Sequence, residues 1–178
     1  MAPYDLQIFR EVHLGWHQAW LDPIMLVLSY TGLGQVQAVF ALYWLRYNET
    51  RHRVLPLLLS ILVSGLVVAQ ILKRLIPRDR PSNLNFAKPS EDFYANSFPS
   101  GHTTTAFAVA TMMILLTYRS RRWWHGPVAW LWALGVGVSR VYRGVHWPSD
   151  VFTGALAGVM ASCLLWLAMP AKWKGWED

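Results

Sequence analysis

Long apolar stretches separated by short charged segments dominate the pattern of this chain. Residues 23–45 and 54–72 contain no Asp, Glu, Lys or Arg, and each is long enough to cross a membrane as a helix, which takes about 20 residues. Three more apolar stretches follow in the second half of the chain. The pattern therefore predicts an all-α, polytopic membrane bundle of about five transmembrane helices. The expected spans are residues 23–45, 54–76, 103–118, 127–142 and 151–169.

Residues 1–22 show a different pattern, in which apolar and charged residues alternate. Phe9, Val12, Trp16 and Trp20 recur at helical spacing with polar residues between them. The spacing predicts an amphipathic helix that lies in the membrane interface. A helix that caps one end of the bundle would show the same pattern. Both arrangements leave residues 1–178 as a single membrane-embedded domain.

Composition supports a membrane protein and excludes an ordinary soluble domain. Hydrophobic residues make up 54% of the chain and charged residues 15%, with a mean hydropathy of +0.25, whereas a soluble domain is about 25% charged. The net charge of +6 would suggest nucleic acid as a partner of a soluble protein. In a membrane protein, topology and anionic lipids explain it, so we expect no nucleic-acid partner. The single cysteine, Cys163, excludes an intramolecular disulfide.

Five crossings would divide the connecting segments between two membrane faces. Residues 46–53, residues 119–126 and the C-terminus share the first face. The N-terminal helix, residues 77–99 and residues 143–149 share the second face. The sixteen basic residues divide equally between the two faces, so a count of Lys and Arg does not orient the chain. The first face carries fewer acidic residues, and the orientation has to come from function.

Ionisable residues gather on the second face in three blocks at the ends of predicted spans. Each block alone has an ordinary explanation, such as interfacial basic side chains, a structural histidine or a helix cap. Short loops bring all three to one pocket, and ionisable groups that converge in a membrane bundle indicate a function. The blocks are Lys73-x6-Arg80-Pro81, Pro99-Ser100-Gly101-His102 and Ser139-Arg140-x5-His146-x3-Asp150.

The chemistry of this pocket favours an anion over a metal ion. Its histidines and its one carboxylate are too few to complete a metal site, and the neighbouring cations would repel a metal. Lys73, Arg80 and Arg140 instead suit phosphate oxygens. Backbone N–H groups around Ser100 and Gly101 would add donors at a helix N-terminus. We therefore expect a phosphate site without a metal or another cofactor.

Two histidines supply this phosphate site with the groups that phosphoryl transfer requires. Asp150 lies one helical turn beyond His146 and can accept a hydrogen bond from Nδ1 of that histidine, which leaves Nε2 as the nucleophile. His102 can protonate the leaving oxygen as a general acid and then take a proton from water. The expected catalytic residues are therefore His146, His102 and Asp150.

Taken together, the three blocks resemble the signature of the type 2 phosphatidic acid phosphatase superfamily. The resemblance covers roughly residues 20–170. It implies that a phosphohistidine intermediate forms on His146 and that His102 acts as acid and base. It also implies a set of residues that contact phosphate: Lys73, Arg80, Ser100, Gly101, His102 and Arg140.

The N-terminal segment is similar to that of the short bacterial members of this superfamily. Six-span members cross the membrane once more before the region matched by residues 23–45. The short members include undecaprenyl pyrophosphate phosphatases, which have a comparable Ile8-Phe9 and Leu21-Asp22-Pro23-Ile24-Met25 pattern. In bacterial relatives the site faces the periplasm or the cell exterior. The resemblance thus implies a multi-pass protein of the cytoplasmic (inner) membrane, with the first face in the cytoplasm.

These observations predict a metal-independent phosphatase that hydrolyses a terminal phosphate of a membrane lipid. The candidate substrates are undecaprenyl pyrophosphate, phosphatidylglycerophosphate, phosphatidate and lipid A phosphates, and residues 77–99 with the grooves between spans would select among them. Two alternatives belong to other classes. One is a vanadium haloperoxidase, whose site is similar, and the other is a non-enzymatic anion or lipid carrier that uses the basic pocket.

Overall fold

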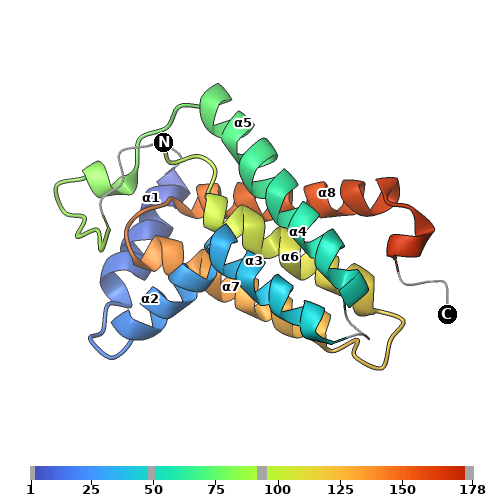
Figure 1. The fold of residues 1–178 in the computed structure, drawn as a ribbon. Coiled ribbons are helices and arrows are strands. Elements are labelled where there is room, and N and C mark those ends of the chain that lie inside the picture. The colour runs from blue at the N-terminus through green and yellow to red at the C-terminus, as the bar shows by residue number, and fades with distance from the viewer. Residues whose placement is uncertain (1–2, 48–50, 92–95, 175–178) are drawn as a thin grey trace.

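A computed structural model describes residues 3–47, 51–91 and 96–174 of the chain. Within these ranges the regular structure is helical and contains no strand (Figure 1), which confirms the expected all-α class. The longer helices are α1 (Pro3–Arg10), α2 (Asp22–Thr31), α3 (Gly34–Tyr43), α4 (Val54–Ile61), α5 (Ala69–Leu75), α6 (Gly101–Thr117), α7 (His125–Tyr142) and α8 (Pro148–Ala168). A π-helical stretch, Leu62–Val68, joins α4 to α5.

Two helices in the described ranges are long and apolar enough to cross a membrane by themselves. They are Arg51–Leu75, which has 25 residues and includes α4 and α5, and α8, which has 21 residues. A third crossing results if α2 and α3 count as one bent span. The helix α6 is apolar but has only 17 residues. The full set of five spans therefore stays a prediction.

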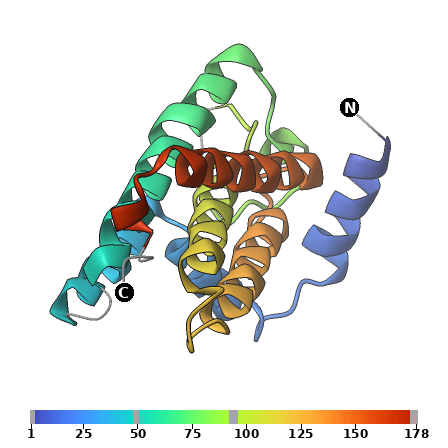
Figure 2. The ribbon, with the colours of Figure 1, turned by 90° about the vertical axis from the view of Figure 1, so that its right-hand side faces the viewer.

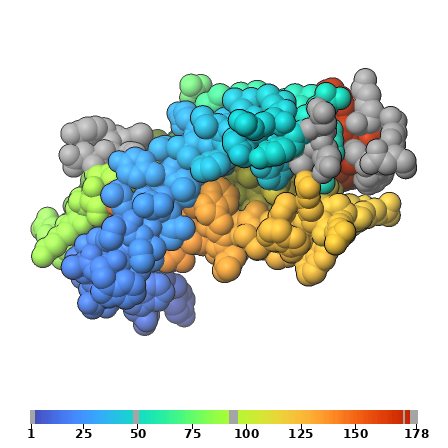
Figure 3. Space-filling model, turned by 60° about the horizontal axis from the view of Figure 1, so that its bottom comes forward, coloured from blue at the N-terminus to red at the C-terminus, as the bar shows by residue number. Residues whose placement is uncertain are grey.

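The expected span over residues 23–45 is not one straight helix, because α2 and α3 meet at an angle of 70°. The break lies at Gly32 and Leu33, where Leu33 has an extended backbone. A Cβ atom on Gly32 would come within 2.6 Å of a Val136 methyl group and 3.2 Å of the Cβ atom of His102. The break thus lets the backbone pass directly against α6 and α7. Figure 3 shows α2 and α3 beside α7 along one face of the molecule.

The helix α6 forms the centre of the bundle, with α4, α7 and α8 packed around it. Small side chains such as Ala106, Ala108 and Ala110 are fully buried on it. On α8, a Cβ atom at Gly158 would lie only 2.2 Å from the carbonyl oxygen of Thr104, so glycine is needed for this close approach. Figure 2 shows α8 lying across α6 and α7.

The outer surface of the bundle is apolar, as expected for a protein surrounded by lipid. Leu66, Leu131 and Leu167 are 66%, 72% and 75% exposed, and they lie on three different sections of helix. Cys163 on α8 is also exposed. A water-soluble surface would not carry so many large apolar side chains. The exposed surface and the apolar helices together support a membrane protein.

The N-terminal helix packs against the bundle through the first half of its predicted apolar face. Phe9 and Val12 are buried, and the ring of Phe9 lies 5.3 Å from that of Trp147. Trp16 and Trp20 are exposed because the helical segment ends at Gly15, before the pattern is complete. The segment therefore packs against the end of the bundle where α8 begins, and its position in the membrane interface stays a prediction.

Candidate active site

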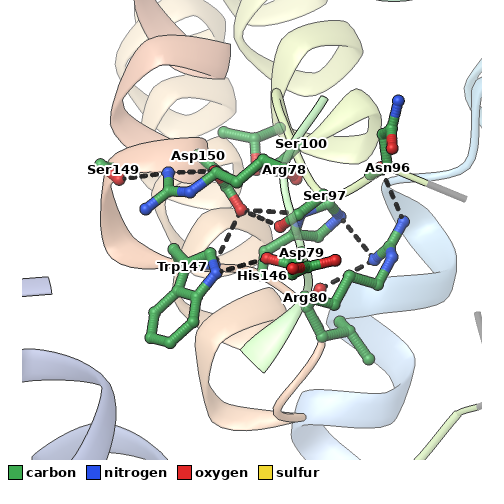
Figure 4. Close-up of polar contacts among 12 residues, drawn as sticks. Arg78, Asp79, Arg80, Asn96, Ser97, Ser100, His146, Trp147, Ser149 and Asp150 are labelled. Atoms are coloured by element: carbon green, nitrogen blue, oxygen red, sulfur yellow. Dashed lines mark hydrogen bonds and ion pairs between the residues drawn. The ribbon is translucent and has the colours of Figure 1, made fainter. Parts of the chain in front are cut away.

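The three motif blocks come together where α5 ends, α6 begins, α7 ends and α8 begins (Figure 4). Arg80, in the segment after α5, places Nη1 3.4 Å from Nε2 of His146. The backbone N–H of Ser100 donates to the carbonyl oxygen of Asp150 at 3.1 Å. His102 interacts electrostatically with Arg140, His146, Arg80 and Lys73. The structure thus brings together the residues that the sequence assigned to one pocket.

The histidine in the loop between α7 and α8 and the carboxylate in the first turn of α8 face each other. Nδ1 of His146 lies 3.5 Å from Oδ2 of Asp150, which is at the outer limit for a hydrogen bond. Both side chains are almost completely buried. Nδ1 makes no closer polar contact among the described residues, so its approach to Asp150 is an ion-pair contact without hydrogen-bond geometry. The remaining nitrogen, Nε2, points to the basic side of the site.

Both oxygens of the Asp150 carboxylate are held by donors from several segments. Oδ2 accepts hydrogen bonds from the Ser97 hydroxyl group and from the backbone N–H of Trp147, the latter at 3.0 Å. Oδ1 accepts from Nη1 of Arg78 at 2.6 Å. Sequence reasoning missed Ser97 and Arg78, although both lie close to motif residues in the chain. The carboxylate is therefore fixed in orientation without any contribution from a ligand.

Burial keeps His146 neutral. Removal from solvent lowers the pKa of His146 to about 3, and the positive charges of Arg140 and Arg80 act in the same direction, while Asp150 opposes them. An imidazole with this pKa carries a lone pair on one ring nitrogen at neutral pH, as a nucleophile must. Burial also lowers the pKa of Arg80, to about 10, with a further contribution from Arg140. The guanidinium group stays charged at neutral pH.

Backbone carbonyl groups hold two of the predicted phosphate-binding cations. Nζ of Lys73 and Nη2 of Arg80 both donate to the carbonyl oxygen of Asn96, at 2.9 and 3.3 Å. The Asn96 amide in turn donates to the carbonyl oxygen of Lys73, and Arg80 also donates to that of Val145 at 2.8 Å. Asn96 thus ties the end of α5 to the segment that precedes α6, a role that the sequence did not indicate.

The third cation, Arg140, lies against an acidic side chain of the same chain. Its guanidinium nitrogens are 3.3 Å from both oxygens of Glu91 and also contact the Ser29 hydroxyl group. Glu91 makes a closer ion pair with Arg143, at 2.6 Å. A carboxylate presents oxygen atoms to arginine much as a phosphate does. Glu91, which lies in the 77–99 loop, therefore occupies a position that suits a substrate oxygen.

The N-terminus of α6 offers fewer donors than the sequence suggested. Ser100 is fully buried, its hydroxyl group accepts from that of Thr103, and its N–H is engaged by Asp150. Ser100 therefore joins the starts of α6 and α8, and its N–H does not face a ligand. Gly101 differs, because a Cβ atom built on it would meet no atom within 4 Å. The open space beside Gly101 leaves room for a bound group.

An apolar groove of about 540 Å³ opens beside His102, between α3 and the helix Arg51–Leu75. Its lining includes Gly101, His102 and Thr105 at the end near the site, and Leu33, Ile61, Leu62 and Leu66 along its walls. The bend between α2 and α3 shapes this end of the groove, because Gly32 and Gly34 both belong to its wall. The groove therefore connects the polar site to the apolar exterior.

No group of three or more His, Cys, Asp or Glu side chains within the described ranges could hold a metal ion. The side chains around His146 are instead mainly basic. This donor set favours an anion over a metal ion.

Comparison with known families decides the relationship of this chain. The profile of the PAP2 superfamily matches residues 53–174, which contain all three motif blocks. The chain belongs to the PAP2 superfamily. The family resemblance inferred from the three blocks is thereby confirmed.

Individual proteins resemble this chain over nearly its whole length. The undecaprenyl-diphosphatase of Sulfolobus acidocaldarius is 30% identical over 171 residues, which are 90% of this chain and 76% of that protein. The crystal structure of Aquifex aeolicus LpxE superposes with a TM-score of 0.81 at 28% identity, over 93% of this chain and 96% of that one. A transmembrane PAP2 type phosphatidylglycerolphosphate phosphatase from Bacillus subtilis gives 0.74 at 27% identity, over 91% and 82%. These likenesses confirm the helical membrane architecture.

Proposed function

We propose that this protein is a metal-independent lipid phosphatase that removes a terminal phosphate through a phosphohistidine intermediate. The observation that carries the proposal is the setting of His146. It is a buried, neutral imidazole with Nδ1 facing Asp150 and Nε2 facing Arg80. Membership of the PAP2 superfamily and the phosphatases among its relatives support hydrolysis of phosphoric esters.

In the first step Nε2 of His146 attacks the phosphorus atom of the substrate. A P–N bond forms as the bond from phosphorus to the leaving oxygen breaks, and His102 gives that oxygen a proton. Asp150 stabilises the imidazolium that develops on His146. Lys73, Arg80 and Arg140 hold the phosphoryl oxygens, whose charge redistributes in the transition state. The lipid then leaves as an alcohol or a monophosphate.

In the second step water attacks the phosphohistidine. His102, which has lost its proton, accepts one from the water, and the P–N bond breaks to release inorganic phosphate. His146 returns to its neutral form, and His102 holds again the proton that it gave to the leaving oxygen. Each turnover thus consumes one water molecule and needs no external proton carrier.

The groove beside His102 supports a lipid as the substrate. Its apolar walls suit a hydrocarbon chain, while its inner end reaches the basic residues of the site. A lipid could therefore lie in the groove with its phosphate group at His146. Our first choice of substrate is undecaprenyl diphosphate, because the relative of that activity matches 90% of this chain.

Phosphatidylglycerophosphate is the second candidate, because a phosphatase of that type shares the fold at a TM-score of 0.74. Both substrates present a terminal phosphate on an apolar chain. We further propose that the site faces the periplasm or the cell exterior from the cytoplasmic membrane. Residues 46–53 and 119–126 would then lie in the cytoplasm.

A phosphate-release panel tests this function. The purified protein is assayed in detergent with EDTA on undecaprenyl diphosphate, phosphatidylglycerophosphate, phosphatidate and lipid A. We expect release from undecaprenyl diphosphate, inhibition by vanadate, and loss of release in His146→Ala. Full activity of His146→Ala would contradict the mechanism. Halide oxidation with added vanadate would instead support a haloperoxidase, and anion flux that persists in His146→Ala liposomes would support a carrier.

A further inference from the structure

The N-terminal helix carries an acidic residue that reaches the far side of the site. Asp5 lies in the first turn of α1 and is only 5% exposed, although α1 ends more than 130 residues before α8 begins. A buried carboxylate is costly unless its oxygens are satisfied. Asp5 is satisfied by another part of the chain, since Ser149 donates to it from its backbone N–H at 2.9 Å and from its hydroxyl group at 2.5 Å.

Arg78 connects this carboxylate to the partner of the nucleophile. Its Nη2 lies 2.5 Å from Oδ2 of Asp5, and its Nη1 lies 2.6 Å from Oδ1 of Asp150. Nη1 also donates to the Ser149 hydroxyl group at 2.7 Å, as Figure 4 shows. One planar guanidinium group thus bridges two buried carboxylates, a geometry that lysine cannot reproduce.

The bridge has a consequence for Asp150 that simple anchoring of α1 would not require. Arg78 engages Oδ1, so that Oδ2 remains directed to Nδ1 of His146. Asp5 shares the positive charge of Arg78. The charges of Asp5, Asp150 and Arg78 therefore sum to one negative charge, which stabilises the imidazolium that forms on His146. Without Asp5 the charge of Arg78 would fall on Asp150 alone and weaken that stabilisation.

We propose that Asp5 and Arg78 are positioning residues for the phosphatase reaction, which orient the Asp150 carboxylate and preserve its negative charge toward His146. The proposal rests on the proposed role of His146 as the nucleophile. Neither residue lies among the phosphate-binding side chains. Both therefore act through Asp150, and the N-terminal helix contributes to the geometry of the active site through Asp5.

A double-mutant cycle in the full-length protein tests this proposal. The substrates are undecaprenyl diphosphate and p-nitrophenyl phosphate, which does not depend on lipid selectivity. We expect Asp5→Asn to lower kcat about 10-fold and Arg78→Gln to lower it about 30-fold, with KM changed less than about 3-fold, as is typical of groups behind a catalytic residue. Arg78→Lys should recover part of the loss, since it keeps the charge and one donor.

The decisive comparison is made in the Asp150→Asn background. If both residues act through Asp150, adding Asp5→Asn or Arg78→Gln there should lower kcat less than about 2-fold further. Effects that multiply with that of Asp150→Asn would overturn the proposal and leave a purely structural role. Glu11→Gln, which removes an exposed carboxylate just beyond α1, is the matched control and should behave as the wild type.

The same assays separate this inference from the proposed function. A wild-type protein that hydrolyses p-nitrophenyl phosphate but not undecaprenyl diphosphate overturns only the proposed substrate. A protein that hydrolyses no phosphate ester overturns the function and this inference together. Thermal midpoints in detergent identify a variant that fails to fold. If Arg78→Gln fails to fold, Arg78→Lys is compared in the wild type and in Asp150→Asn, and these two comparisons complete the double-mutant cycle.

Discussion

The two nitrogen atoms of His146 face surroundings of opposite charge. On the Nδ1 side, one cation, Arg78, is shared by the two buried carboxylates of Asp5 and Asp150. On the Nε2 side the described side chains are mainly cationic. Arg80 lies 3.4 Å from Nε2, Lys73 shares the Asn96 carbonyl oxygen with Arg80, and Arg140 and Arg143 both pair with Glu91. The negative side suits the imidazolium that forms during attack, and the positive side suits the phosphate group.

The two sides also differ in what holds them. On the Nδ1 side, the polar contacts of Asp150 and Asp5 within the chain are 3.0 Å or shorter, apart from the contact between Asp150 and His146. The Nε2 side relies on backbone carbonyl groups and on Glu91, which is 3.3 Å from Arg140. We infer that the Nδ1 side is fixed before the substrate binds and that the substrate completes the Nε2 side. The predictions below test this difference.

The largest effect on activity is expected on the Nδ1 side, from Asp150→Asn. The amide keeps the size of the side chain but loses the charge that stabilises the imidazolium. We expect kcat to fall about 1,000-fold, with little change in KM, by analogy with the orienting carboxylates of other triads. Steady-state phosphate release measures both constants. An effect on KM alone would show that Asp150 does not orient the nucleophile.

A smaller effect is expected on the Nε2 side, from Lys73→Gln. Loss of one of several cations should lower kcat/KM about 10- to 100-fold, because the transition state loses one charged donor. Arg74→Gln is the matched control, since Arg74 is the next residue and is exposed. Equal losses in the two variants would mean that general surface charge, and not contact with phosphate, accounts for the effect.

Glu91→Gln should improve the binding of anions. The carboxylate competes with the substrate for Arg140, so its neutralisation should lower the inhibition constant of inorganic phosphate about 3- to 10-fold, within the usual range for close charges. Competition assays with inorganic phosphate provide the measurement. Weaker binding of phosphate in Glu91→Gln would show that Glu91 supports the site and does not compete with the substrate.

The smallest effect concerns stability at acidic pH. The pKa of His146 is lowered by burial to about 3, so between about pH 6.5 and this value the unfolded chain binds a proton that the folded chain does not. Stability should therefore fall as the pH is lowered from about 7 to 5.5, by about 1 kcal/mol from this residue. Unfolding midpoints of the wild type and His146→Gln provide the comparison, and identical pH slopes would contradict it.

The sequence predicted the Nε2 side far better than the Nδ1 side. Lys73, Arg80 and Arg140 belong to spaced motifs with a direct chemical reason for each residue. Asp5 and Arg78 belong to no such pattern, because their role depends on a contact between segments at opposite ends of the chain. The contact of Glu91 with Arg140 could not be predicted for the same reason, since it depends on how the 77–99 loop folds back onto α7.

The fold shows the same division. Apolar stretches predicted helices near 54–76, 103–118, 127–142 and 151–169, and the structure has helices in each of these regions. The 70° bend at Gly32 was not foreseen, because the residues on both sides of it are equally apolar. The bend accompanies a close approach of Gly32 to α6 and α7, and a sequence pattern does not record such a contact.

The central claim is that the phosphoryl group passes through Nε2 of His146. The direct measurement uses His102→Ala with p-nitrophenyl phosphate, whose leaving group needs no proton, so that the first step proceeds while the attack of water is slowed. We predict a burst of about one p-nitrophenol per protein molecule and an acid-labile phosphoryl group that mass spectrometry locates on His146. The absence of a burst and of a phosphoprotein, or a phosphoryl group on any other residue, would contradict the claim.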